Sequence, residues 1–206
     1  MHGSLEGNAG RRRHRPTSPT EDSRQRQGIR MSPSERSTGG TLILGVLSDT
    51  HGHVRNTEQA VAVFREHAVQ AVVHCGDIGT TSVIDLLAPW TVHYVFGNVD
   101  ESRAELLRAR AERVGGQWHG LAGQIELAGR RIGFTHGHHA PTLHRLTFDE
   151  QLDLVCHGHT HEYRWERVGP TLVLNPGAVY RGSPRSVAIV RLPELQHERI
   201  VLPPAY

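Results

Sequence analysis

Short apolar runs and amphipathic stretches alternate along the chain from residue 41 onward. Each of six apolar runs has the length of a strand and ends in a cluster of polar residues. These runs cover residues 41–49, 71–77, 92–97, 130–137, 152–161 and 171–177. Patterns typical of helices separate or follow the first three runs, over about residues 56–68, 81–88 and 102–114, with Asn56 and Ser102 as predicted N-caps. Strands that alternate with helices are expected to be parallel.

The second half of the chain has a different pattern. Residues 124–136 and 163–177 each contain two apolar runs joined by a glycine-containing turn, which predicts two antiparallel hairpins. Further strands are predicted over residues 186–192 and 198–203. An α/β half followed by a β-rich half favours an α/β fold of two stacked sheets with helices outside.

The polar clusters at the ends of the runs carry the candidate chemistry. The carboxyl ends of strands in an α/β sheet form the crevice where sites are built. Residues at i and i+2 point to one face of a strand. The ligand types are carboxylate, imidazole and amide oxygen, which suit Mn²⁺, Fe or Zn²⁺ and differ from the thiolates of a structural zinc site. The clusters therefore predict a polynuclear metal site, and they are Asp49-Thr50-His51, Gly76-Asp77, Gly97-Asn98, His136-Gly137-His138, His159-Thr160-His161 and Asn175-Pro176-Gly177.

Composition narrows the classes of function. The 206 residues contain no lysine, so all 23 basic residues are arginines, which excludes lysine nucleophiles, Schiff bases and the P-loop lysine. The two cysteines, Cys75 and Cys156, cannot form a disulfide framework and are expected to be buried free thiols. No apolar run has the length of a membrane span, and no signal-type segment follows Met1, so we expect a cytoplasmic protein without a membrane partner.

Residues 1–40 differ in composition from the rest of the chain. They are rich in Arg, Ser, Pro and Gly and have almost no apolar residues to bury, which predicts a disordered tail before a domain over residues 41–206. The tail has no aromatic interleaving and no recognised nucleic-acid motif, so we expect no nucleic-acid partner. Whether translation starts at Met1 or Met31 stays open.

The combined motifs resemble those of the calcineurin-like metallophosphoesterases, most closely the small bacterial and archaeal phosphodiesterases of the YfcE type. The resemblance covers about residues 41–202 and implies a four-layer α-β-β-α sandwich. It implies two divalent cations, foremost Mn²⁺ with Fe, Ni or Zn as alternatives, and in-line attack on phosphorus by a bridging hydroxide. The motifs are D-x-H (49–51), G-D (76–77), G-N-x-D (97–100), T-H-G-H (135–138) and G-H-T-H (158–161), together with H-C-G-D and N-P-G.

Carried over position by position, the resemblance implies seven ligands. Asp49, His51 and His161 would hold the first cation. Asp77 would bridge both cations and take part in catalysis. The second cation would be held by Asn98, His136 and His159, with Asn98 also counted as catalytic.

One position departs from the wider family. Many relatives have a proton-donating histidine after the asparagine, where this chain has Val99, which cannot donate a proton. We predict His53 or His138 as a substitute donor, and Asp100 as a residue that orients ligand imidazoles. Four further histidines are expected near the site or in the core: His139 and His157 beside the ligands, and His74 and His93 packed in strands.

These features predict a metal-dependent phosphodiesterase that acts on a small-molecule phosphoester. The alternatives are a phosphomonoesterase or nucleotidase, and a non-catalytic scaffold like the retromer subunit of this fold. All seven ligand positions are intact here, which favours the enzyme. Residues 139–150 and the Arg181–Arg185 loop are candidate specificity segments, because an arginine there could bind a substrate phosphate. Homo-oligomerisation stays open.

Overall fold

The computed structural model describes residues 40–204. The predicted disordered tail over residues 1–40 therefore lies, except for Gly40, outside the described residues. No helix within residues 40–204 combines the length and the apolar character needed to cross a membrane.

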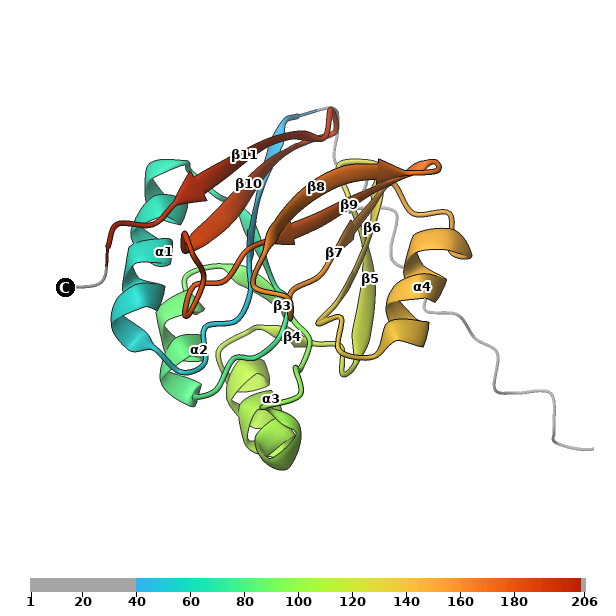
Figure 1. The fold of residues 1–206 in the computed structure, drawn as a ribbon. Coiled ribbons are helices and arrows are strands. Elements are labelled where there is room, and N and C mark those ends of the chain that lie inside the picture. Colours follow the sequence, from blue (N-terminus) through green and yellow to red (C-terminus); the bar gives the residue numbers. More distant parts are fainter. Residues whose placement is uncertain (1–39, 205–206) are drawn as a thin grey trace, which may run out of the picture. The chain divides into compact units, whose positions relative to one another are not determined.

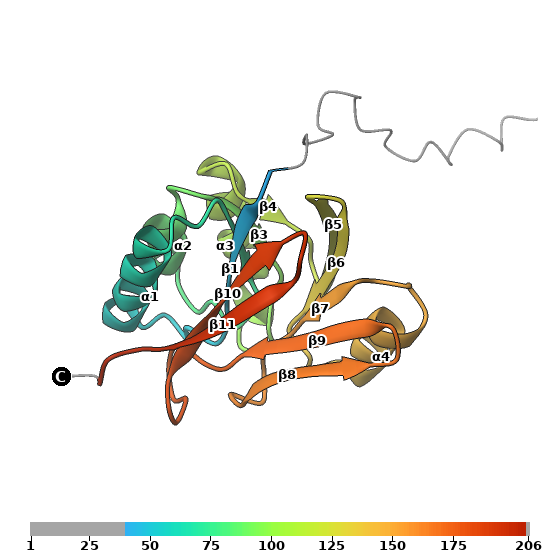
Figure 2. The same cartoon turned by 90° about the horizontal axis from the view of Figure 1, so that it is seen from above.

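Two mixed β-sheets pack face to face, and helices cover their outer faces (Figure 1). The first sheet has the strand order β11-β10-β1-β2-β3-β4, and the second has the order β5-β6-β7-β9-β8. Helices α1, α2 and α3 lie on one side of the pair of sheets, and α4 lies on the other, as the view in Figure 2 also shows. This arrangement confirms the predicted four-layer α-β-β-α sandwich.

The first half of the chain supplies most of the first sheet. Its elements are β1 (Leu42–Leu47), α1 (Val54–Glu66), β2 (Ala71–His74), α2 (Thr81–Leu87), β3 (Thr91–Tyr94), a 3-10 turn (Glu101–Arg103), α3 (Ala104–Arg113) and β4 (Gln117–Trp118). Strands β1 to β4 are parallel, as the alternation of strands and helices predicts.

The second half supplies the second sheet and closes the first. Its elements are β5 (Ala122–Leu127), β6 (Arg130–Thr135), α4 (Ala140–Phe148), β7 (Leu154–Cys156), β8 (Tyr163–Val168), β9 (Thr171–Pro176), β10 (Ser186–Leu192) and β11 (Gln196–Val201). The pairs β5–β6 and β8–β9 are the two predicted antiparallel hairpins. Strands β6, β7 and β9 are parallel to one another, whereas β10 pairs antiparallel with β1.

Three hydrophobic cores separate the four layers. In β2, Val72 packs in the core between the first sheet and its helices, while its neighbour Val73 packs in the core between the two sheets. Strand β10 alternates in the same way, because successive side chains of a strand point to opposite faces. The third core, under α4, contains Leu146, Leu152 and Val155. Strands buried on both faces explain why the sequence shows continuous apolar runs.

Several local predictions were wrong. Helix α1 begins at Val54, and its N-cap is His53, whose Nδ1 accepts a hydrogen bond from the backbone amide of Asn56. Asn56 is instead buried and donates from Nδ2 to the carbonyl of Val179 at 3.0 Å. Ser102 caps no helix, because a 3-10 turn precedes α3.

Residues 139–150, one of the two candidate specificity segments, are largely helical. Pro141 occupies the first turn of α4, where a missing backbone N–H costs nothing. Arg145 pairs with Glu150 through a side-chain hydrogen bond, so its guanidinium is already engaged within this segment.

His93 lies within β3, as a packed histidine should. Its ring is buried, its Nδ1 lies 3.1 Å from His119 Nε2, and its ring centroid is 6.0 Å from that of Phe134. Burial, with a smaller contribution from His119, lowers the pKa of His93 from 6.5 to about 4. The folded protein therefore holds this ring neutral under conditions where an unfolded chain would protonate it.

The acid stability of the metal-free protein should depend on His93. Because the folded-state pKa is depressed, the stabilisation is present above pH 6.5 and is lost as the pH falls from 6.5 toward 4. Linkage predicts that this one residue removes about 2 kcal/mol from the free energy of unfolding between pH 7.5 and pH 5. Urea unfolding at both pH values should show that His93→Phe loses less stability on acidification than wild type. His144→Phe, at an exposed histidine of α4, is the control and should keep the wild-type pH dependence.

Candidate metal centre

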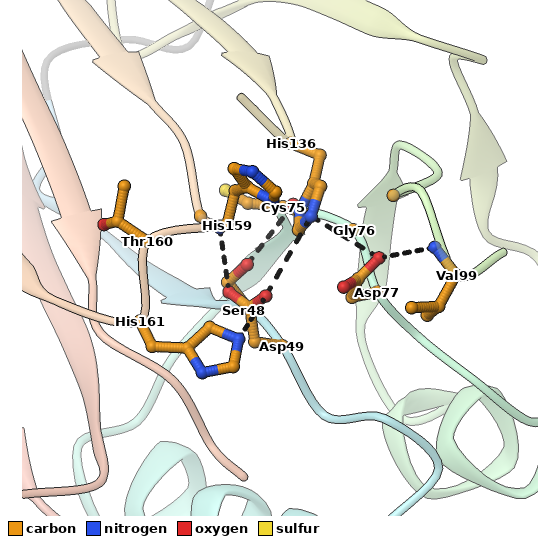
Figure 3. Close-up of polar contacts among 12 residues, drawn as sticks. Ser48, Asp49, Cys75, Gly76, Asp77, Val99, His136, His159, Thr160 and His161 are labelled. Carbon is orange, nitrogen blue, oxygen red and sulfur yellow. Dashed lines mark hydrogen bonds and ion pairs between the residues drawn. The ribbon is translucent and has the colours of Figure 1, made fainter. Parts of the chain in front are cut away.

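The ends of four strands bring five of the predicted metal-binding residues to one place. Asp49 follows β1, Asp77 follows β2, His136 follows β6, and the segment from His159 to His161 follows β7. In Figure 3, Asp49 lies between His161 and His136, and Asp77 lies on the other side of His136. Val99, in the segment after β3, contacts Asp77 from the outside: its backbone amide donates to Asp77 Oδ1 at 3.1 Å.

The backbone of this cluster is strained. Asp49, His51, Asp77, His159 and His161 all have positive φ angles, between 47° and 70°. The left-handed region costs a residue with a side chain roughly 1–2 kcal/mol. Such strain persists where the surrounding structure imposes it, and it concentrates at functional sites. Five of the seven predicted ligands therefore adopt a backbone conformation that local preference opposes.

A buried hydrogen-bond network holds the segment after β1 against the segment after β2. His74 Nδ1 accepts from the backbone amide of Gly76 at 3.2 Å, so its Nε2 carries the hydrogen in the neutral ring and donates to Thr50 Oγ1 at 3.0 Å. Thr50 Oγ1 in turn donates to the carbonyl of Ile78 at 3.0 Å. Burial lowers the pKa of His74 to about 3, which keeps this tautomer neutral. The packed histidine thus fixes the spacing between Asp49 and Asp77.

Asp100 joins the segment after β2 to the segment after β3. Its carboxylate oxygens accept from the backbone amides of Ile78, Gly79 and Gly97, at 2.9, 2.8 and 3.0 Å. The prediction that Asp100 orients ligand imidazoles was therefore wrong, because both its oxygens bind backbone amides. Asn175 has a similar role for the segment after β7, because its Nδ2 donates to the carbonyl of Gly158 at 2.9 Å.

The side-chain atoms of five predicted ligands converge. Asp49 Oδ1 lies 3.2 Å from His161 Nε2, 3.9 Å from His51 Nε2 and 4.0 Å from His136 Nε2. Asp77 presents one oxygen to each side: Oδ2 lies 3.6 Å from His51 Nε2, and Oδ1 lies 3.4 Å from His136 Nε2. Two groups of three, Asp49 with His51 and His161 and Asp49 with Asp77 and His136, each have one ligand atom apiece within 4.8 Å of the others.

The chemistry of the donor set fits cations better than it fits a closed protein core. Asp49 Oδ1 and His136 Nε2 are both buried and have no partner with hydrogen-bond geometry among the described residues. A buried polar atom without a partner is costly, and native proteins rarely leave one unexplained. Carboxylate oxygens and imidazole nitrogens that converge on one point are the ligands expected for Mn²⁺, Fe or Zn²⁺.

The charges of the cluster also favour cations. Burial raises the pKa of Asp49, but His161 and the charge of His136 outweigh it and lower that pKa below its usual value. Burial raises the pKa of Asp77 as well, but its contact with His136 outweighs that effect and lowers the pKa overall. Burial lowers the pKa of His136, yet Asp77 and Asp49 raise it above the ordinary value. Two ionised carboxylates are thus held in a poorly solvated place.

Asn98 and His159 lie beside the cluster rather than in it. His159 donates its backbone amide to Asp49 Oδ2 at 3.1 Å, and its exposed ring lies 5.1 Å from the ring of His136. Asn98 is an exposed residue immediately before Val99. Neither belongs to the two groups of converging ligand atoms, so their role as ligands stays a prediction.

The two predicted proton donors lie on different sides of the cluster. His138 Nε2 is 3.8 Å from Glu101 Oε1, its Nδ1 is buried without a partner among the described residues, and burial lowers its pKa. Its ring lies 5.4 Å from that of His136. His53 caps α1 through Nδ1, and its ring stacks on Tyr180 at 4.8 Å. His139 Nδ1 instead lies 2.8 Å from Thr142 Oγ1 within α4.

Two residues near the cluster had no clear signal in the sequence. Tyr180 follows the N-P-G segment, and its backbone amide donates to the carbonyl of Asp49 at 3.0 Å. Ser48 contacts Gly158 so closely that a Cβ on Gly158 would lie 1.8 Å from Ser48 Oγ.

The two cysteines, Cys75 and Cys156, which precede two candidate ligand segments, are buried free cysteines as predicted.

Comparison with known proteins gives consistent matches. The model of the calcineurin-like phosphoesterase superfamily domain matches residues 42–194. Phosphodiesterase MJ0936 of Methanocaldococcus jannaschii is 29% identical over 167 residues, which cover 77% of this chain and 98% of that protein. A solved structure of an archaeal phosphodiesterase is similar with a TM-score of 0.71 at 29% identity, covering 78% of this chain and 100% of its own. YfcE, a phosphoesterase from E. coli, shares the fold with a TM-score of 0.56 at 22% identity, covering 79% of this chain and 100% of its own.

Proposed function

The chain belongs to the calcineurin-like phosphoesterase superfamily, and from this premise we propose that it is a dinuclear-metal-dependent phosphodiesterase acting on small-molecule phosphoesters. The observation that carries the proposal is the placement of Asp77. One of its oxygens faces His51 and the other faces His136, which is the orientation that a carboxylate shared by two cations needs.

The ligand assignment follows the two sides of Asp77. Asp49, His51 and His161 would hold one cation, and Asp77 would bind it through Oδ2. The other cation would be held by His136 and by Asp77 Oδ1, completed by two side chains at the rim, those of Asn98 and His159. Mn²⁺ is the first choice because oxygen and imidazole ligands suit it. When bound, such cations would supply positive charge to the phosphate oxygens and would lower the pKa of the attacking water.

The residues around the cluster determine whether the leaving group receives a proton. Val99 is exposed beside Asp77 and cannot donate a proton, so this position supplies no general acid. His138 is the better placed of the two candidate donors. Its ring lies 5.4 Å from that of His136, and its Nδ1 has no partner among the described residues. His53 Nδ1 is already used as a helix cap. We therefore assign His138 as the residue that contacts the leaving oxygen, and we expect weak proton donation.

The phosphodiesterase assignment is further supported by MJ0936, which bears that name and is 29% identical across nearly its whole length. A phosphomonoesterase is the second candidate, since the same ligand set can bind a dianionic ester. A purely structural scaffold is not favoured, because two carboxylates and three imidazoles converge at strand ends as a cation site requires and packing alone does not.

The test is the rate of hydrolysis by Mn²⁺-loaded protein across phosphodiesters with graded leaving-group pKa, with the matched monoesters beside them. We expect kcat/KM to fall steeply as the leaving-group pKa rises, because proton donation by a well-placed acid, typically worth 10²- to 10⁴-fold, is largely lacking. Diesters should exceed monoesters. A kcat/KM that does not depend on the leaving-group pKa would contradict the assignment of a weak proton donor. Faster hydrolysis of monoesters than of diesters would favour a phosphomonoesterase instead.

A further inference from the structure

The wall of the site beside His51 is formed by the segment that follows β9. The backbone amides of Val179 and Tyr180 donate to the carbonyls of Ser48 and Asp49, at 3.1 and 3.0 Å. The carbonyl of Val179 also accepts from Asn56 Nδ2. Hydrogen bonds to the end of β1 and to α1 thus fix this segment relative to the proposed metal ligands.

Three side chains on this wall form one stack. The ring of Tyr180 lies nearly parallel to that of His53, with centroids 4.8 Å apart and planes at 19°. The guanidinium carbon of Arg181 lies 5.1 Å from the centroid of the Tyr180 ring, within the range of a cation–π contact. The same ring is 6.0 Å from that of His51, a proposed ligand. Tyr180 therefore holds a guanidinium beside the site.

Arg181 itself is exposed. Its contact with the Tyr180 ring, which in turn lies beside the ring of His51, places the guanidinium next to the first set of proposed ligands.

Apart from its contact with the Tyr180 ring, the side chain of Arg181 has no partner among the described residues. Within residues 40–204, no carboxylate lies at ion-pair distance from its guanidinium, and no side-chain hydrogen bond involves it. Arg185, four residues later, donates instead to Gln59 and to the carbonyl of Pro203. Arg181 also has a left-handed backbone, with φ at 61°, which costs roughly 1–2 kcal/mol. The exposed guanidinium is therefore free to bind an anionic group at the rim of the site.

We infer that Arg181 binds a second anionic group of the substrate, which makes it a specificity-determining residue, with Tyr180 as the residue that positions it. The inference rests on the proposed function. The buried cluster of Asp49 and Asp77 accounts for the scissile phosphate, so the exposed guanidinium meets a group that extends outward from it. Guanidinium binds carboxylates and phosphates alike through two parallel hydrogen bonds, and the higher charge of a terminal phosphate makes phosphate the stronger ligand. The substrate class is therefore a phosphodiester that carries a further phosphate, such as a nucleotide ester.

Two substrates that differ only in this group provide the test. Thymidine 5′-(p-nitrophenyl phosphate) with and without a 3′-phosphate release the same leaving group. Wild-type Mn²⁺-loaded protein should hydrolyse the 3′-phosphorylated ester with a kcat/KM at least about tenfold higher, mainly through KM. Arg181→Gln should bring this ratio close to one, Arg181→Lys should keep part of it, and Tyr180→Leu should reduce it. The control is Arg167→Gln at the far end of β8, which should keep the wild-type ratio.

Calorimetric binding of the two product-like ligands gives a readout without turnover. Thymidine 3′,5′-bisphosphate should bind wild type at least about tenfold more tightly than thymidine 5′-monophosphate, and Arg181→Gln should remove the difference. If both esters are hydrolysed without preference, or if Arg181→Gln keeps the preference, the inference is overturned and the proposed function stands. If neither ester is hydrolysed but the bisphosphate preference depends on Arg181, the inference stands and the diesterase proposal fails.

Discussion

Replacing Asp77 with asparagine should abolish diester hydrolysis and lower the metal content of the purified protein from two ions per chain to one or none. Asparagine keeps the shape of the side chain but replaces one of two charged oxygens with a neutral amide nitrogen, which does not bind cations. Since Asp77 faces both His51 and His136, the change weakens both proposed cation sites. We expect a loss in kcat/KM on the order of 10³-fold or more, measured together with metal content by mass spectrometry.

The matched control is Asp85→Asn on α2. Asp85 pairs with Arg110 at the surface, and its loss should cost little because exposed ion pairs contribute little to stability. Metal content and turnover should stay at wild-type values in this control. Two bound ions and near-wild-type turnover in Asp77→Asn would contradict the shared-carboxylate assignment.

Gly97→Ala should have an effect of similar size through a different cause. A Cβ on Gly97 would lie 2.0 Å from Asp77 Oδ1 and 2.5 Å from the backbone nitrogen of Asp77, and heavy atoms cannot approach so closely. Because part of the obstacle is backbone, a rotamer change of Asp77 does not relieve it. The carboxylate must therefore leave its present position, and we expect loss of metal and of activity while the fold is retained, as measured by circular dichroism and metal analysis.

Gly129→Ala separates this steric effect from the general cost of replacing a glycine. Gly129 lies in the β5–β6 turn with φ at 75°, and a Cβ there would meet nothing within 4 Å. That variant should lose roughly 1 kcal/mol of stability and keep its metal. A Gly97→Ala protein that binds two ions and turns over substrate like wild type would show that the segment after β3 yields without moving Asp77.

The sequence predicted which side chains converge better than it predicted where the surrounding helices begin. The candidate ligands lie at the carboxyl ends of strands, and strand-end placement depends on a period of two and on parallel order, both of which are visible in the apolar runs. Asp49, His51, Asp77, His136 and His161 converge for this reason. Asn98 and His159 differ because they lie on the exposed rim, where the conformation of a loop, rather than the direction of a strand, places a side chain.

Two wrong predictions, the start of α1 and the role of Asp100, have the same physical cause. Both depend on which backbone amides the tertiary structure leaves unpaired, and a local sequence pattern does not indicate this. Helix α4 did have a signal in the sequence: Pro141 lies in its first turn, and Leu143 and Leu146 at helical spacing face the core under it.

The cation–π contact of Arg181 on Tyr180 could not be predicted from the sequence. Adjacent residues of an extended chain point to opposite sides, and Arg181 departs from that conformation with a left-handed backbone.

Electron paramagnetic resonance of the Mn²⁺-loaded protein, combined with a count of bound ions, tests the central claim most directly. Cations that share Asp77 would lie about 3.5–4 Å apart and would be exchange-coupled. The account predicts two Mn²⁺ per chain with a coupled spectrum, and loss of that coupling in Asp77→Asn. A single ion per chain, or two ions that give only the spectrum of isolated Mn²⁺, would contradict it.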